Sequence, residues 1–239
     1  MLCNTPLTAP PAPTVTFHHC DITSTPSIDR TATALRTTIG APTILILNAG
    51  VCRGKPLLEN TDDDLNLTFG VNTIAHYKLA REFVPDMIAH NHGMVVTVAS
   101  SAAWVTAPRM TEYAASKAAA LAFHEGLAAE LVVAKAPKVR TVVVNQGYTQ
   151  TSLFKGFGVK SGAFFGPALH VDTVAEAIVN QVLKGESGQI ILPGIYKLMA
   201  AHIRSMPDWL SYPSRAGLWN LMENWTGRQV EIPGMTNGE

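Results

Sequence analysis

Four short apolar runs divide the chain at regular intervals. Each is nearly continuous in Val, Ile and Leu, as expected for strands that are buried on both faces of a parallel sheet. A fifth run at 14–21 (TVTFHHCD) is less apolar but rich in β-forming residues and is also predicted to be a strand. The four apolar runs are TILILNAG at 43–50, GMVVTVASS at 93–101, KVRTVVVNQG at 138–147 and GQIILP at 188–193.

The segments between these runs have the apolar spacing of helices. The first ends at Gly40, and the second opens with acidic residues that are typical of a helix start. Strands that alternate with helices predict an α/β domain with a doubly wound parallel sheet. The predicted helices cover 27–39, 61–90, 111–131 and 172–185.

Polar residues follow the predicted strands directly. In sheets of this class, ligands bind beyond the carboxyl ends of the strands, so these residues are the first candidates for a site. They are Asp21, then Asn48-Ala49-Gly50, then Ser100-Ser101, and finally Asn145-Gln146-Gly147.

The alanine-rich helix at 111–131 carries a second group of candidates. Tyr113 and Lys117 are four residues apart and share a helix face, while Ser100 ends the preceding strand. An ammonium about 4 Å from the phenol, at an effective dielectric constant of ~20, would lower the tyrosine pKa from about 10 toward about 7. The pair could then exchange a proton near neutral pH, with Ser100 holding a substrate oxygen. By itself, Tyr-x-x-x-Lys is common and is more typical of a surface tyrosine and lysine on an amphipathic helix than of a functional site.

Composition narrows the class of protein. The 239 residues suit one α/β domain, and the net charge of zero gives no electrostatic case for binding nucleic acid. The three scattered cysteines suggest a reducing compartment without disulfides, and no apolar run reaches the ~18 residues of a membrane span. The proline-rich start at 1–13 lacks the features of a secretory signal and is expected to be irregular. No metal site is predicted, because His90 and His92 lie in a turn and His18 and His19 point to opposite faces of a strand.

Taken together, these motifs resemble the short-chain dehydrogenase/reductase (SDR) family. The order and intervals match its pattern: 24 residues separate Asn48 from Asn72, 13 separate Ser100 from Tyr113, and four lead on to Lys117. The resemblance covers roughly residues 14–195. Two segments, VNTIAHYKLAREFVPDM and HNHGMVVTVASSAAWVTAPRMTEYAASKAAALAFHEGLAAEL, are most similar to the branch that holds 17β-hydroxysteroid and retinol dehydrogenases. That branch implies a Rossmann-like fold and a lipophilic alcohol or ketone as substrate.

The resemblance implies a role for individual residues. Tyr113 would be the acid/base, Lys117 would lower its pKa and bond the nicotinamide ribose, and Ser100 would orient the substrate oxygen. Asn72 would hold a water that links Lys117 to solvent. The implied contacts to NAD or NADP, besides Tyr113 and Lys117, come from Asp21 at the adenine, Asn48, Ala49 and Gly50 at the floor, Arg81, and Gly147, Thr149 and Thr151 at the nicotinamide end.

Several of these residues have simpler interpretations. Asn72 could bond its own helix backbone, Asp21 could cap a turn, and Thr149 could be ordinary loop polarity. Gln146 departs from the family, which usually has proline there, so a backbone N–H is restored and a modest effect on nicotinamide placement is expected.

The N-terminus also departs from the family. Members begin with a strand, a Thr-Gly-x-x-x-Gly-x-Gly turn that approaches the pyrophosphate, and a helix. This chain has no glycine before Gly40, and the run at 14–21 resembles the family's third strand. We therefore expect an N-terminally truncated domain that lacks the first two strands, on the order of 50 residues or more, and leaves the strand at 43–47 with an unpaired edge and one uncovered face. A shortened gene model and a degenerate paralogue are the two explanations.

The predicted organisation is an irregular lead-in (1–13), a partial SDR domain (14–195) and an apolar, helical C-terminal extension (196–239). The extension holds three of the four tryptophans, and residues 196–225 could form a substrate lid, lie on a membrane surface, or pack on the domain or a second subunit. We expect a cytoplasmic homodimer, with peripheral membrane association as an alternative. For function, an NAD(P)-dependent oxidoreductase competes with a non-catalytic binding or dimerising relative.

Overall fold

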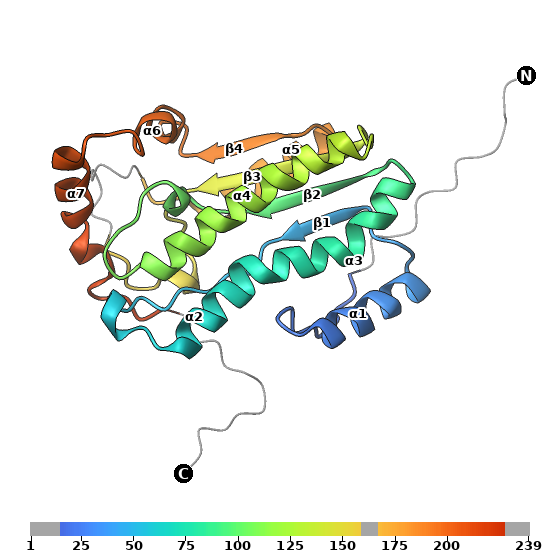
Figure 1. Ribbon diagram of the computed structural model, residues 1–239, viewed down its shortest axis with the longest axis horizontal. Helices are drawn as coiled ribbons and strands as arrows, with labels where there is room; N and C mark the ends of the chain where they lie inside the picture. Colours follow the sequence, from blue (N-terminus) through green and yellow to red (C-terminus); the bar gives the residue numbers. More distant parts are fainter. Residues whose placement is uncertain (1–14, 159–166, 228–239) are drawn as a thin grey trace, which may run out of the picture.

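Four parallel strands form one sheet in the order β1-β2-β3-β4 in the computed structural model (Figure 1). The structure describes residues 15–158 and 167–227. The four apolar runs are confirmed as strands. They are β1 (Ile44–Leu47), β2 (Gly93–Val98), β3 (Val139–Gln146) and β4 (Gly188–Leu192).

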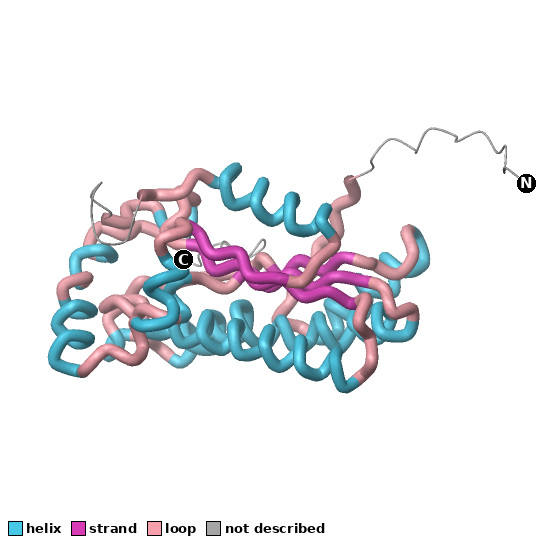
Figure 2. Tube along the Cα trace, turned by 90° about the horizontal axis from the view of Figure 1, so that it is seen from above, coloured by secondary structure: helices cyan, strands magenta, loops and turns pink. Residues whose placement is uncertain are grey.

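Helices cover both faces of this sheet, which confirms the doubly wound α/β class. Figure 2 shows the sheet edge-on between two helical layers. α3 and α4 pack on one face against β2 and β3, α1 packs on α3, and α5 lies on the opposite face against β3 and β4. The bounds are α1 (Thr25–Thr38), α2 (Asp62–Phe69), α3 (Ala75–Ala89), α4 (Thr111–Val133) and α5 (Val171–Lys184).

Strand β2 is the centre of the core. All six of its residues are buried, because successive side chains point into different helical layers. Val95 packs into a cluster with Phe123 of α4 and Val84 of α3, whereas Val96 packs with Val174 of α5 on the other face. This double cover explains why the run reads as continuously apolar.

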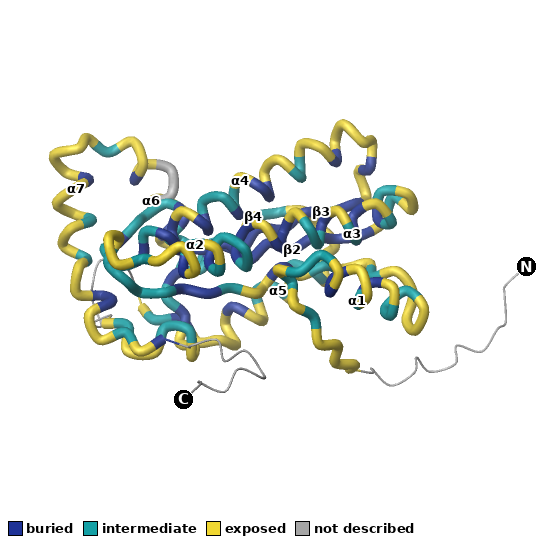
Figure 3. Tube along the Cα trace, turned by 60° about the horizontal axis from the view of Figure 1, so that its bottom comes forward, coloured by how far each residue is buried: buried dark blue, intermediate teal, exposed yellow. Residues whose placement is uncertain are grey.

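Strand β1 forms an edge of the sheet among the described residues. Ile44 and Ile46 pair in register with Met94 and Val96, so they belong to the face that α5 covers farther along. They are nevertheless 46% and 48% exposed, whereas the neighbouring strand β2 lies in the dark blue, buried part of Figure 3. The expected free edge and uncovered face are therefore present.

The run at 14–21 is not a strand over its described residues 15–21, which corrects the prediction from its β-forming residues. Val15 is 96% exposed and Phe17 is 88% exposed. A strand needs a neighbour for its backbone hydrogen bonds, and the described part of the chain places none beside this segment. The lead-in at 1–13 lies outside the described residues.

The predicted long helix at 61–90 is divided into three parts. Thr61 and Asp64 form a capping box at the start of α2. A π-helical turn, Gly70–Ile74, then separates α2 from α3. π-turns of this kind often occur at functional sites, and this one carries Asn72.

The C-terminal segment is helical and folds back toward the strand ends. After β4 come α6 (Tyr196–His202), α7 (Asp208–Ala216) and a 3₁₀ turn at Trp219–Met222. The Trp225 indole N–H donates to the Leu153 carbonyl at 2.8 Å and anchors the end of the described tail. Among the described residues, no helix is long and apolar enough to span a bilayer.

Candidate active site

One cavity of about 500 Å³ opens at the carboxyl ends of the strands. Tyr113 and Lys117 reach it from the first turns of α4, and Ser100 reaches it from the end of β2. These three residues are buried, with 4%, 3% and 8% of their surface exposed. The other predicted residues that line this cavity are Asn48, Ala49, Gly50, Gly147, Thr149 and Thr151.

Asn72 is completely buried and holds two segments together. Its side-chain oxygen accepts from the Val51 N–H at 2.8 Å, and its side-chain nitrogen donates to the Val51 carbonyl and the Ser116 hydroxyl, each at 2.9 Å. These bonds tie the Asn48–Gly50 loop to α4. The side chain therefore does not bond its own helix, and its implied role of holding a water near Lys117 stays a prediction.

Burial controls the charge state of Tyr113 and Lys117. The Lys117 ammonium donates to the Val98 carbonyl at 2.8 Å and lies 5.9 Å from the centre of the Tyr113 ring. Loss of hydration lowers the pKa of Lys117 to about 8. Loss of hydration, and then the nearby Cys52, raise the pKa of Tyr113 above its ordinary value, while the hydrogen bond with Ser100 lowers it. Desolvation is the largest of these causes, so the net direction of the Tyr113 pKa shift is opposite to the lowering expected from the sequence.

Gly147 lets the backbone approach the site closely, whereas a side chain at Gly50 would fit. A Cβ at Gly50 would lie 3.5 Å from the Lys117 nitrogen and 3.6 Å from the Asn72 oxygen, which are ordinary contact distances. A Cβ at Gly147 would lie 2.7 Å from the Tyr196 ring, which is closer than any real side chain permits. The Thr149 hydroxyl donates to the Gly147 carbonyl at 3.2 Å and steadies this turn.

Two predicted cofactor residues lie outside this cavity. Asp21 accepts hydrogen bonds from the backbone N–H and the hydroxyl of Thr23, so it caps the turn before α1, which is the simpler of its two interpretations. These bonds hold the pKa of Asp21 below its usual range. Arg81 is exposed on α3 and does not line the cavity.

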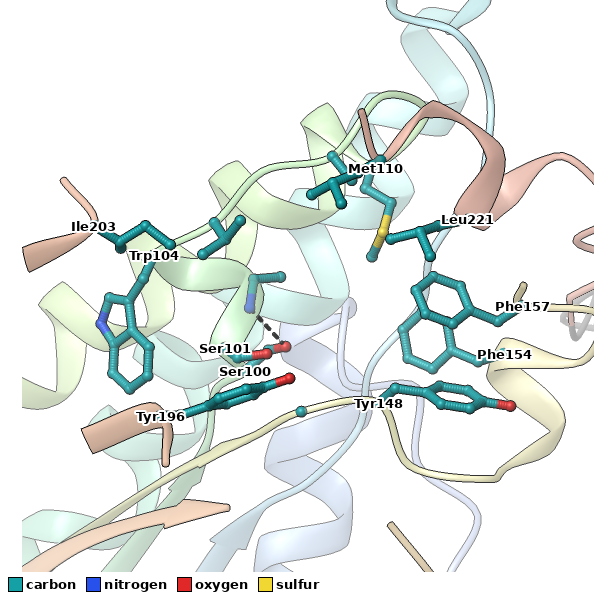
Figure 4. A pocket seen from close by; sticks show the side chains of 15 residues that line it. Ser100, Ser101, Trp104, Met110, Tyr148, Phe154, Phe157, Tyr196, Ile203 and Leu221 are labelled. Atoms are coloured by element: carbon teal, nitrogen blue, oxygen red, sulfur yellow. Dashed lines mark hydrogen bonds between the residues drawn. The ribbon is translucent and has the colours of Figure 1, made fainter. Parts of the chain in front are cut away.

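A second, aromatic hollow adjoins the first and was not found from the sequence. It has a volume of about 70 Å³ and shares Ser100, Gly147 and Phe154 with the larger cavity. Figure 4 shows Trp104 and Tyr196 on one side, Tyr148, Phe154 and Phe157 on the other, and Ser100 between them. The available signal was the three aromatic residues that closely follow Gly147, at positions 148, 154 and 157.

The structure combines a parallel sheet with a π-turn that carries Asn72. It also places the buried Ser100, Tyr113 and Lys117 in one cavity. The family model for short chain dehydrogenases matches residues 5–160. The chain belongs to the short-chain dehydrogenase family. This membership confirms the resemblance drawn from Asn48, Asn72, Ser100, Tyr113 and Lys117.

Individual relatives place the chain within this family. It is 46% identical over 128 residues to Dehydrogenase RED3 of Cochliobolus heterostrophus (strain C4 / ATCC 48331 / race T), covering 53% of this chain and 65% of that protein. It is 36% identical over 157 residues to Retinol dehydrogenase 10-B of Danio rerio, covering 65% of this chain and 47% of that protein. The second match confirms the similarity to the retinol dehydrogenase branch. The chain thus spans about half to two thirds of the length of these relatives.

A solved structure supports the same fold. A short chain dehydrogenase from Burkholderia cenocepacia J2315, determined in complex with NADP, superposes with a TM-score of 0.62 at 28% identity. The match covers 82% of this chain and 75% of that one.

Proposed function

We propose that this domain is an NAD(P)-dependent oxidoreductase that interconverts a lipophilic alcohol and ketone. The observation that supports it is that Ser100, Tyr113 and Lys117 line the same cavity as the Asn48–Gly50 loop. Family membership and the relatives named as dehydrogenases point to the same chemistry.

The residues of the cavity fit one end of a nicotinamide cofactor. The ammonium of Lys117 and the hydroxyls of Thr149 and Thr151 could bond a ribose and a carboxamide, while Val174 and Ile178 offer an apolar wall to a flat ring. NAD or NADP, when bound, would supply or accept the hydride.

The protein itself would handle the proton and the substrate oxygen. With its pKa raised, Tyr113 is protonated at neutral pH, so its hydroxyl can donate a proton to a carbonyl oxygen that becomes an alcohol. Ser100 shares a hydrogen bond with Tyr113 and could hold the same oxygen. Tyr113 is only 4% exposed, and low exposure to solvent strengthens both contacts.

The test is hydride transfer by the purified chain with NADPH or NADH and a lipophilic ketone, followed by cofactor absorbance. Ser100→Ala and Lys117→Ala variants should each lower turnover while circular dichroism stays unchanged. Turnover that is insensitive to both substitutions would contradict the proposal.

Cofactor binding should be weak in this chain. Lys117 is the only cation among the described residues that line the cavity. The negative charge of the cofactor's pyrophosphate would therefore be only partly neutralised by this lining. We expect NADPH and NADH to bind at least ~100-fold more weakly than to the Burkholderia cenocepacia relative, which corresponds to about 3 kcal/mol. Isothermal titration measures this, and a micromolar dissociation constant would contradict it.

A non-catalytic role is the second candidate function. Among the described residues β1 is an edge strand whose backbone could pair with another polypeptide, and its exposed Ile44 and Ile46 leave an apolar face for the same partner to cover. A folded chain that shows no turnover, whether or not it binds the cofactor, would favour this role.

We also propose that a homodimer forms through α3 and α4. The outer face of α4 presents small exposed residues, including Ala115, Ala122 and Gly126, which allow close helix packing. Light scattering at micromolar concentration should show twice the monomer mass.

Residues 196–225 carry a separate proposal of peripheral membrane contact. Trp209, Tyr212 and Trp219 are 76%, 64% and 58% exposed, and aromatic side chains of this kind favour the headgroup region of a bilayer. Cosedimentation with phosphatidylcholine and phosphatidylserine vesicles tests it, and a triple serine variant at these positions should abolish binding.

A further inference from the structure

The aromatic hollow beside Tyr113 has a uniform chemical character. Its walls carry five aromatic side chains, and none of the described residues that line it bears a charge. Ser100 lies at its junction with the larger cavity, so a group seated in the hollow would place its oxygen near Tyr113. The five aromatic residues that would contact a ligand in the hollow are Trp104, Tyr148, Phe154, Phe157 and Tyr196.

Phe154 is the ring that joins the hollow to the candidate acid/base. It lies edge-on to Tyr113, with ring centres 5.7 Å apart and planes at 86°. It also contacts Phe157 at 5.5 Å and Tyr148 at 6.3 Å in edge-to-face arrangements. A flat ring that enters beside Phe154 therefore meets the faces and edges that aromatic pairs prefer.

The C-terminal segment fixes the position of these rings. The Trp225 indole donates to the Leu153 carbonyl at 2.8 Å, and the Thr226 N–H donates to the Lys155 carbonyl at 3.0 Å. Gly156 has a φ of +82°, and a Cβ there would lie 2.0 Å from the Asn224 carbonyl oxygen. Because the backbone on both sides of Phe154 is held in this way, the ring is pre-organised and loses little freedom when a ligand binds.

The volume of the hollow and its uncharged lining further restrict the class of ligand that it can bind. The volume of about 70 Å³ is far below the roughly 300–1,000 Å³ of sites for drug-sized ligands, so a single small ring fills the hollow and the rest of the ligand extends into the adjoining cavity. A carboxylate or phosphate in the hollow would lose its hydration without gaining a charged partner among the described lining residues.

We propose that the hollow selects an uncharged substrate whose reacting carbon is attached to a planar, unsaturated ring, and that Phe154 determines this preference. The proposal rests on the oxidoreductase function above and names its substrate class. A saturated ring of similar size offers no π-face to Phe154 and packs less closely between the aromatic walls.

The test compares two ketones that differ only in the ring. Acetophenone and cyclohexyl methyl ketone are titrated into the 239-residue chain, and binding is measured by ligand-observed NMR without cofactor. Acetophenone should bind about fivefold more tightly, and its anionic analogue 4-acetylbenzoate at least about tenfold more weakly than acetophenone. Equal or tighter binding of the cyclohexyl ketone, or no binding of either ketone, would overturn the proposal.

Two variants at one position show whether Phe154 is responsible. Phe154→Leu should remove the preference while cyclohexyl methyl ketone binds within about twofold of wild type, and Phe154→Tyr should retain the preference. Phe17→Leu is the matched control and should retain the preference, because Phe17 is 88% exposed and does not line the hollow. An unchanged preference in Phe154→Leu would contradict the assignment of this residue.

Turnover of the same ketones separates this proposal from the function on which it rests. A ring preference in binding without any hydride transfer would reject the oxidoreductase function and leave the selectivity intact. Hydride transfer at equal rates to both ketones, with equal affinities, would reject the selectivity alone.

Discussion

Strands β1 and β2 are neighbours with similar apolar sequences, yet their environments differ. Every residue of β2 is buried, whereas Ile44 and Ile46 of β1 are 46% and 48% exposed. Helices lie on both sides of β2, but among the described residues α5 packs on β3 and β4 and leaves the equivalent face of β1 open. An apolar run therefore specifies a strand, and the elements that cover it decide how much that strand contributes to stability.

The same contrast continues into the loops that follow these strands. Ser100, after β2, is 8% exposed and lies close to Tyr113, while Asn48 and Ala49, after β1, are exposed. The buried side of the site carries the groups proposed for proton transfer. The open side carries the loop proposed for the cofactor, and Asn72 links the two by bonding Val51 and Ser116.

The largest expected effect comes from placing the same charge on each strand. Val96→Asp should destabilise the fold by at least about 4 kcal/mol, because it buries an unpaired carboxylate between two helical layers. Ile46→Asp should cost less than about 1 kcal/mol, because solvent reaches that side chain. Urea unfolding followed by circular dichroism measures both, and equal losses would show that β1 is covered in solution.

The next effect concerns the two loops and is read from turnover. Tyr113→Phe should lower kcat at least ~100-fold, as expected when a positioned acid/base is lost. Asn48→Ala, on the open side, should mainly weaken cofactor binding and lower kcat less than about tenfold. Steady-state rates at saturating NADPH provide the comparison, with thermal unfolding as the control for folding. Near-normal kcat in Tyr113→Phe would refute its role.

Lys117 should make stability depend on pH on the buried side. Its folded pKa of about 8 lies below the value of 10.5 for a solvated lysine, so the folded chain binds fewer protons between these limits. Stability should therefore rise as pH increases from 8 to 10.5, by up to about 3 kcal/mol relative to Lys117→Met. Urea unfolding across this range gives the difference. Lys138→Met, at an exposed lysine, is the control, and its stability should change with pH as that of the wild type does. If the stability of Lys117→Met changes with pH in the same way, the predicted effect of burial is wrong.

The smallest effect on the folded chain is expected from surface substitutions that alter assembly. Ala122→Arg on the exposed face of α4 should convert the proposed dimer to a monomer, because a long charged side chain prevents close helix packing. Ile46→Asp on β1 should leave the dimer unchanged. Light scattering distinguishes the species, and dissociation by the β1 substitution instead would place the interface at the sheet edge.

Much of the fold and part of the site could be predicted from the sequence. Four strands and the main helices have the expected positions, because apolar periodicity is a local property of the chain. Tyr113 and Lys117 share a cavity with Ser100 because a four-residue helical interval and a strand end place them there. The prediction of a strand at 15–21 was wrong, because a strand needs a neighbouring strand for its hydrogen bonds and the local sequence does not specify that neighbour.

The sequence by itself therefore determined the α/β alternation, the family and the set of Ser100, Tyr113 and Lys117. Only the tertiary structure decided that Asn72 clamps two segments, that burial raises the pKa of Tyr113, and that Phe154 and the tail build an aromatic hollow. The physical reason is the distance along the sequence over which each property is determined. Helical and strand spacing depend on neighbours a few residues apart, whereas hydration, cover and cavity walls depend on groups that only folding brings together.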